Sequence, residues 1–137
     1  MNLLSVRIIT SNIDGLIKFY EEITGLSFIR YTPEFAELNT DRATLAIGSI
    51  NTMKAFSERD IVTAIQNTSV IIEFMVDDVD KLYEKISAVV DASIVQKPTL
   101  MPWGNKSLLF RDPDGNLVNL FTPVSEQAMK KFDVNHS

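Results

Sequence analysis

Residues 102–121 read PWGNKSLLFRDPDGNLVNLF, and this stretch decides the fold. Two apolar-rich runs flank the quartet DPDG at residues 112–115. The proline presets the φ angle of the first central position, and Gly115 accepts a positive φ, so the quartet predicts a tight chain reversal. The segment therefore predicts a β-hairpin. Trp103 lies just before it, where a large flat side chain could face a cavity.

Residues that the chain lacks exclude several classes of functional site. There is no cysteine, and the single histidine is His136, next to the last residue. Thiolate metal sites, Ser-His and Cys-His catalysis, and metal sites that need an internal imidazole are therefore excluded. The sequence argues against a metalloenzyme, and we expect no cofactor.

The overall composition is that of an ordinary globular protein. The 137 residues, 45% hydrophobic and 23% charged, fit one domain or two small halves that share a core. No apolar run approaches the ~18 residues of a membrane span, and the first residues do not resemble a signal peptide. The lack of cysteine fits a reducing compartment, so we expect a cytoplasmic location. The net charge of −5 disfavours nucleic acid as a partner and mildly favours a cationic ligand.

Hydrophobic periodicity predicts a strand, a helix and three short strands in the first part of the chain. The strand covers residues 6–10. Ser11 and Asp14 have the spacing of a capping box at the start of the helix, and Gly25 suits a left-handed cap at its end. The β-prone runs lie at residues 26–31, 35–39 and 43–47. The bridge from 48 to 68 has no clean period, which predicts a loop with one helical turn at most.

The same order of elements is predicted again in the second part. A strand covers residues 69–76, Asp78 caps a helix, and a run at 94–96 precedes the hairpin. The two helices match at a spacing of 63 residues, with five identities in ten positions. We interpret this as an internal duplication, although two amphipathic helices can also share common residues by chance.

The expected fold class is α+β, with two β-α-β-β-β modules forming a curved mixed sheet cleft. One domain, 1–137, would contain the modules 3–50 and 68–123, a linker at 51–67, and a C-terminal helix or tail at 124–137. Each helix would cover one face of its sheet. The two free faces could then form a shared concave trough, where small-molecule sites usually lie.

Two charged residues are expected to face this trough. Alternation along the strand at 69–76 points Ile71, Glu73 and Met75 away from the helix, and Arg7 holds the place of Glu73 in the first module. Either Arg7 and Glu73 form an ion pair, or Glu73 is an anionic anchor for a cationic ligand, because an unpaired charge in a partly dry cleft is costly. Asn119 would add an uncharged donor and acceptor.

The order and spacing of three motifs resemble the vicinal-oxygen-chelate superfamily, which includes glyoxalase I, extradiol dioxygenases and bleomycin-resistance proteins. The motifs are FY at residues 19–20 followed by TGL, the helix start VDDVDKLYEKI from residue 76, and the F-RDPDGN-V-L hairpin. The resemblance covers about residues 3–122. It implies, for glyoxalase-like members, a divalent metal held by one ligand from each of four strands. Those positions match Ser5, Ala46, Ile71 and Asn119, a set that could not hold a metal ion firmly.

The branch that the chain resembles most is the metal-free bleomycin-resistance proteins, which sequester drugs and so confer antibiotic resistance. The matching stretches are PWG-n-F-RDPDGN, the EFAELNTDRATLAI run and the segment from Asn67. This resemblance implies a homodimer whose drug stacks on aromatic side chains matching Phe35 and Trp103. The sequence departs from the pattern at Gly48, where a small hydroxylated residue is often found.

Two functional hypotheses follow, with a third beside them. The first is a non-catalytic homodimeric binding protein for a planar or cationic small molecule. The second is a metal-independent lyase or isomerase that uses Glu73 as general acid or base in a water-poor cleft. The third is a domain whose ligand site has decayed and which now only mediates assembly.

Overall fold

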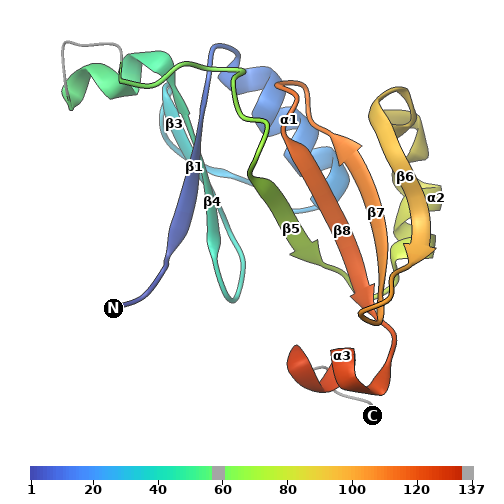
Figure 1. Ribbon diagram of the computed structural model, residues 1–137. Helices are drawn as coiled ribbons and strands as arrows, with labels where there is room; N and C mark the ends of the chain where they lie inside the picture. The colour runs from blue at the N-terminus through green and yellow to red at the C-terminus, as the bar shows by residue number, and fades with distance from the viewer. Residues whose placement is uncertain (57–60, 134–137) are drawn as a thin grey trace. The chain divides into compact units, whose positions relative to one another are not determined.

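The computed structural model describes residues 1–56 and 61–133, and His136 lies outside them. The chain divides into two compact units, Met1–Asn67 and Thr68–Ser137 (Figure 1). Each unit has its own sheet and its own long helix. In the part of the chain that is described, no helix is long and apolar enough to cross a membrane.

The first unit contains a four-stranded sheet and helix α1 (Ile13–Thr24). The strand order is β1-β4-β3-β2, in which β1 runs parallel to β4 and β3 is antiparallel to both of its neighbours. A 3-10 helix of six residues, η1, follows the sheet, so the bridge begins with about two helical turns where one at most was predicted. The bounds are β1 Ser5–Thr10, β2 Ile29–Thr32, β3 Phe35–Asn39, β4 Thr44–Ser49 and η1 Ile50–Ala55.

The second unit repeats this arrangement around helix α2 (Val79–Val90). Its strand order is β5-β8-β7-β6, with β5 parallel to β8 and β7 antiparallel to both of its neighbours. The hairpin predicted around the DPDG quartet is β7–β8. The bounds are β5 Ile71–Met75, η2 Asp91–Ser93, β6 Ile94–Leu100, β7 Asn105–Arg111, β8 Leu117–Pro123 and α3 Glu126–Lys131.

The two units therefore confirm the α+β class and the duplicated β-α-β-β-β order. The first strand and the helix of each unit lie 66 residues apart, because β1 and β5 begin at Ser5 and Ile71, and α1 and α2 begin at Ile13 and Val79. The spacing of 63 residues inferred from helix identities was wrong by nearly one helical turn. A shift of three residues keeps the apolar stripe of a helix on nearly the same side, so the stripe alone could not fix the register.

Both helices begin and end as their sequences require, with one correction. The cap of α1 is Asn12, whose Oδ1 accepts a hydrogen bond from Gly15 N at 3.1 Å, so the predicted Ser11 cap was one residue early. Gly25 ends this helix with φ 71°, as predicted. Asp78 caps α2 by accepting from Lys81 N at 3.1 Å.

Each helix covers one face of its own sheet. In the first unit, Arg30 lies on the same sheet face as the buried Ala36, with which it pairs. Its Nη2 atom is 2.6 Å from Oδ1 of Asp14 in α1. In the second unit, Lys106 reaches Asp80 of α2 at 2.7 Å. Residues paired across neighbouring strands point to the same side of a sheet, so the register shows which side chains face the helix and which face away. We call the side away from the helix the open face of each unit.

Hydrogen bonds to the side chain of Asp112 stabilise the DPDG turn. Asp112 is buried, and its Oδ1 accepts hydrogen bonds from Asp114 N and Asn116 N, both at 2.9 Å. Its Oδ2 accepts from Asn116 Nδ2, also at 2.9 Å. Gly115 adopts φ 85°, which supplies the positive φ that the turn requires. The quartet therefore has a structural role, which is to fix the register of β7 and β8.

Candidate functional site

The open face of the first unit carries a cation over an aromatic ring. The Arg7 guanidinium carbon lies 4.7 Å from the centroid of the Phe35 ring and 6.0 Å from that of Phe56. The Tyr31 ring lies 6.1 Å from the Phe35 ring, at an interplanar angle of 32°. Such distances permit an attraction between the guanidinium charge and the ring faces. We call these four residues the Arg7 cluster.

Gly48 lies directly beneath this cluster. It pairs with Phe35 in the β3–β4 register and is buried. A Cβ atom at this position would lie 3.0 Å from Thr52 Oγ1 and 3.6 Å from the Phe35 ring. The close contact would therefore be with the Thr52 hydroxyl, whereas the distance to the Phe35 ring is that of ordinary van der Waals contact. A direct contact between Gly48 and a ligand stays a prediction.

The open face of the second unit carries a carboxylate and an amide. Glu73 and Asn119 pair directly across β5 and β8, and Asn119 Nδ2 donates a hydrogen bond to Glu73 Oε2 at 2.8 Å. Glu73 is exposed. The Oδ1 atom of Asn119 is buried and accepts no hydrogen bond from residues 1–56 or 61–133. The amide nitrogen of Asn119 therefore orients the Glu73 carboxylate, and the amide oxygen Oδ1 is an acceptor without a hydrogen bond among the described residues.

Arg7 and Glu73 occupy equivalent places in the duplicated fold, since Arg7 pairs with Ala46 as Glu73 pairs with Asn119. They belong to different units. The proposed ion pair between them stays a prediction. Within its own unit Arg7 is placed over aromatic rings, and Glu73 is hydrogen-bonded to Asn119.

Trp103 lies in a short turn before β7 and is 64% exposed. Gly104 N donates to Met101 O at 2.9 Å and closes this turn, with a φ of 92° at Gly104. The carbonyl oxygen of Gly104 accepts from Val124 N and Ser125 N at 2.8 and 3.0 Å, which ties the turn to the start of α3. The indole is thus outside the core of its unit, on a backbone that is fixed by hydrogen bonds.

Asn105, the next residue, was missed by sequence reasoning. Its side chain is 8% exposed, and its Oδ1 has no hydrogen-bond partner in the part of the chain that the structure describes. It pairs with Pro123 in the β7–β8 register. The alternation of β7 was the signal that could have found it, because an amide at a buried strand position needs a partner.

The four positions that match glyoxalase metal ligands all lie in sheet strands, but their chemistry does not fit a metal. Ala46 is 2% exposed and Ile71 is an exposed apolar side chain, so neither offers a donor atom. Ser5 and Asn119 contribute only an uncharged hydroxyl and an uncharged amide. Two neutral oxygen donors do not bind a divalent ion firmly.

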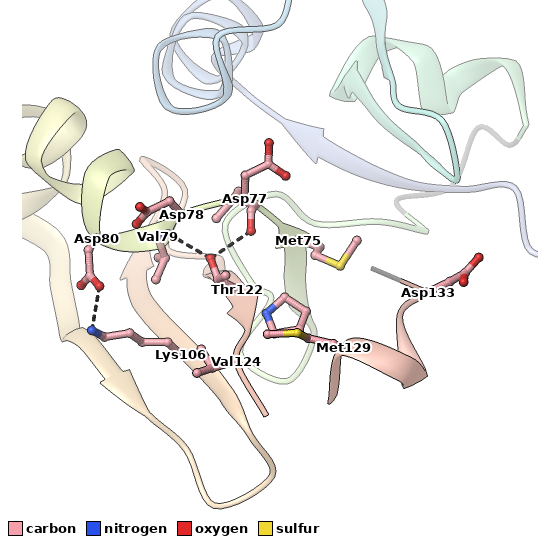
Figure 2. A pocket seen from close by; sticks show the side chains of 12 residues that line it. Met75, Asp77, Asp78, Val79, Asp80, Lys106, Thr122, Val124, Met129 and Asp133 are labelled. Carbon is pink, nitrogen blue, oxygen red and sulfur yellow. Dashed lines mark hydrogen bonds and ion pairs between the residues drawn. The ribbon is translucent and has the colours of Figure 1, made fainter. Parts of the chain in front are cut away.

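A pocket that sequence reasoning missed lies in the second unit, between the start of α2 and α3. Its volume is about 700 Å³, and residues 75–80, 106, 122–124, 129 and 133 line it. Figure 2 shows Met75 and Met129 on one side of the pocket and the Asp80–Lys106 pair on the other. We call it the α2–α3 pocket. The acidic residues at 77–80 indicate only the start of a helix in the sequence. The pocket could not be predicted, because its other walls come from segments that are distant in the sequence.

A family model and one relative match most of the length of this chain. The family model described as Glyoxalase/Bleomycin resistance protein/Dioxygenase superfamily matches residues 2–120. An uncharacterized protein of Bacillus subtilis (strain 168), YraH, is 25% identical over 126 residues, which cover 88% of this chain and 98% of that protein.

Solved structures show the same fold at low sequence identity. A glyoxalase/bleomycin resistance protein/dioxygenase from Nocardioides has a TM-score of 0.73 at 16% identity, over 92% of this chain and 85% of that one. A lactoylglutathione lyase from Agrobacterium tumefaciens has a TM-score of 0.66 at 21% identity, over 88% of this chain and 92% of that one. Because the family model spans most of the sequence and the fold agrees, the chain belongs to the Glyoxalase/Bleomycin resistance protein/Dioxygenase superfamily.

Proposed function

We propose that this chain is a metal-independent binding protein for a planar aromatic cation, which it sequesters in the manner of bleomycin-resistance proteins. The observation that carries the proposal is Trp103, a 64% exposed indole on a turn closed by hydrogen bonds. An aromatic ring on a fixed backbone offers stacking area with little loss of conformational freedom on binding.

The charges around the proposed site favour a cation. Glu73 is exposed and is oriented by Asn119. When it is ionised, its carboxylate is negatively charged and can only accept hydrogen bonds, which suits a cationic ligand that donates them. On the first unit, the guanidinium of Arg7 occupies the face of the Phe35 ring, so a cationic ligand would have to displace it to stack there. The net charge of −5 adds a weak long-range attraction.

The test is a titration of the protein with proflavine, a planar aromatic cation, and with bleomycin. Because Trp103 is the only tryptophan, all indole emission comes from one place, and we expect saturable quenching. Calorimetry on Trp103→Ala should show binding weakened by roughly two- to tenfold, since an aromatic contact contributes about 0.5–1.5 kcal/mol beyond burial. Glu73→Gln should weaken binding too, while Glu22→Gln, an exposed change on α1, serves as the matched control. Unchanged affinity in Trp103→Ala would overturn the proposal.

Metal independence is part of the proposal and rests on the side chains at the ligand positions. Elemental analysis of protein purified without chelator should find far less than one zinc, nickel or iron per chain. One tightly held equivalent would contradict it, because Ala46 and Ile71 provide no ligand atoms.

A two-fold dimer would complete the proposed site. Both units expose large apolar side chains, including Tyr31 on the first unit and Ile71 and Trp103 on the second. Exposed apolar side chains that gather in a patch mark interaction sites, and two-fold pairing is the commonest way to cover such a patch. Sedimentation should give roughly twice the chain mass of 15.4 kDa. A strict monomer at micromolar concentration would contradict this part.

A second candidate is an enzyme in which Glu73 moves a proton. The observation that favours it is the hydrogen bond from Asn119, because a general base must be held in one orientation. Such an enzyme would exchange a carbon-bound hydrogen of its substrate with deuterium from solvent, and Glu73→Gln would abolish exchange while binding remained. A binder would show no exchange with any ligand that it holds.

A further inference from the structure

The α2–α3 pocket has two different sides. Met75 and Met129 contribute apolar surface on one side, with Asp133 beyond them, and the Asp80–Lys106 pair lies on the other side with Val124 next to it (Figure 2). Its volume of about 700 Å³ lies within the range of small-molecule pockets, about 300–1,000 Å³. Methionine side chains are flexible and polarizable, so such a wall adapts to apolar groups of different shape.

Most polar groups in the wall already have partners. The Thr122 hydroxyl accepts a hydrogen bond from Val79 N and donates one to Val76 O, both at 2.9 Å. Lys106 Nζ lies 2.7 Å from Asp80 Oδ2, which neutralises the one cation among the described lining residues. A ligand therefore finds neither a free hydroxyl nor a free ammonium group in this wall.

The charge that remains is negative. The Asp77 side chain makes no hydrogen bond or ion pair with the residues described, and Asp78 uses Oδ1 to cap α2. The start of a helix ordinarily attracts anions. In α2 this end is occupied by Asp78 and Asp80, so an anionic ligand would meet carboxylates instead of free N–H groups.

We propose that the α2–α3 pocket is a separate binding site for a small organic cation with an apolar body, such as an alkylammonium ion. The apolar part would lie against Met75 and Met129, and the ammonium group would face Asp77. Neither Trp103 nor Glu73 lines this pocket, so the site is independent of the binding function proposed above.

The test uses methyl-labelled methionine and nuclear magnetic resonance on the full chain. The probe is hexyltrimethylammonium, with hexanol and hexanesulfonate as neutral and anionic probes of the same chain length. The chain has five methionines, so the spectrum is simple. We expect saturable shifts of the Met75 and Met129 methyl signals with the cation, and unchanged signals for Met53 and Met101, which do not line the pocket. Equal binding of hexanesulfonate, or equal shifts of Met53 and Met101, would overturn the proposal.

Variants separate this site from the other one. Asp77→Asn should weaken binding of the cation roughly two- to fivefold at low salt, as expected for one partly exposed charge. Asp41→Asn, an exposed aspartate in the first unit, is the matched control and should bind as the unaltered protein does. Trp103→Ala should leave the Met75 and Met129 shifts unchanged. Loss of those shifts in Trp103→Ala, or full affinity in Asp77→Asn, would refute a separate site.

Discussion

Asn119 donates a hydrogen bond to Glu73 at 2.8 Å between two directly paired strand positions, and the equivalent positions in the other unit are held by Ala46 and Arg7. The duplicated fold thus contains this pair of neighbouring strand positions once in each unit. In one unit an amide supports a carboxylate, and in the other a small buried side chain lies beside a guanidinium that turns to Phe35. At this pair of positions the two units therefore carry opposite charges, although the strand pairing is the same.

Replacing the amide of this pair should make stability depend on pH. Asn119→Asp places two carboxylates side by side, and like charges at this distance repel. We expect urea unfolding at neutral pH to show a loss of about 1 kcal/mol, limited by the exposure of Glu73. The loss should shrink near pH 4, where one of the two groups can accept a proton.

The matched control is Asn39→Asp on the first unit. Asn39 Oδ1 accepts a hydrogen bond from Thr44 Oγ1 at 2.8 Å, and an aspartate would accept the same bond. This variant should unfold at nearly the same urea concentration as the unaltered protein at both pH values. Equal stability of Asn119→Asp at neutral pH would show that the Glu73 hydrogen bond is not formed in solution.

A second prediction concerns the turn that carries Trp103. A Cβ atom at Gly104 would overlap with the side chain of Ser125 and lie 3.3 Å from Ala128 Cβ, at a residue whose φ is 92°. Gly104→Ala should therefore lower the free energy of unfolding by roughly 2–4 kcal/mol, because backbone strain and overlap add.

Gly115→Ala separates these two causes. Its φ of 85° imposes the same kind of backbone strain, but a Cβ atom there meets nothing within 4 Å. We expect a loss of only about 1 kcal/mol in urea unfolding. Equal losses in Gly104→Ala and Gly115→Ala would contradict the close packing of the turn against α3.

The hairpin, the end of α1 at Gly25 and the Asp78 cap of α2 could be predicted because their determinants are local. Gly25 and the DPDG quartet carry their backbone preferences wherever they occur, and both are found as predicted. The alternation of β5 also held, so Glu73 was assigned to the correct face. These features depend on a few neighbouring residues, which a sequence shows directly.

The features that were missed depend on contacts between distant segments. The α2–α3 pocket joins the end of β5, the start of α2 and α3, and no local pattern indicates that Met75 and Met129 share a wall. Asn105 differs, because the alternation of β7 indicates that it is buried, and only the lack of a partner for its Oδ1 depends on the packing around it. The helix register failed for another reason, since apolar spacing repeats every three to four residues and allows neighbouring alignments.

A third prediction concerns Tyr83 in α2, which bonds to Asp91 at the end of this helix. Tyr83 donates a hydrogen bond to Asp91 Oδ1 at 2.6 Å, and this bond, together with desolvation and the negative charge of Asp91, raises the pKa of Tyr83 above its ordinary value of 10.0. A pKa that is higher in the folded chain means that the contribution to stability is present below pH 10.0 and is lost as the pH rises through the folded pKa.

Ultraviolet titration of the tyrosinate band measures this effect. Asp91→Asn should move one of the three tyrosine transitions to lower pH, whereas Asp41→Asn should leave all three in place. A titration curve for Asp91→Asn that coincides with that of the unaltered protein would show that Asp91 does not raise the pKa of Tyr83.

The last prediction decides whether Trp103 serves the core or a ligand. Its indole is 64% exposed, so Trp103→Ala should change the free energy of unfolding by less than about 1 kcal/mol. Phe110→Ala, in the adjoining strand, removes a ring that is 0% exposed and should cost about 3–5 kcal/mol. Urea unfolding followed by far-ultraviolet circular dichroism compares the two without relying on tryptophan emission. If Trp103→Ala loses about 3 kcal/mol or more, the indole is part of the packed structure, and its assignment to a binding site is wrong.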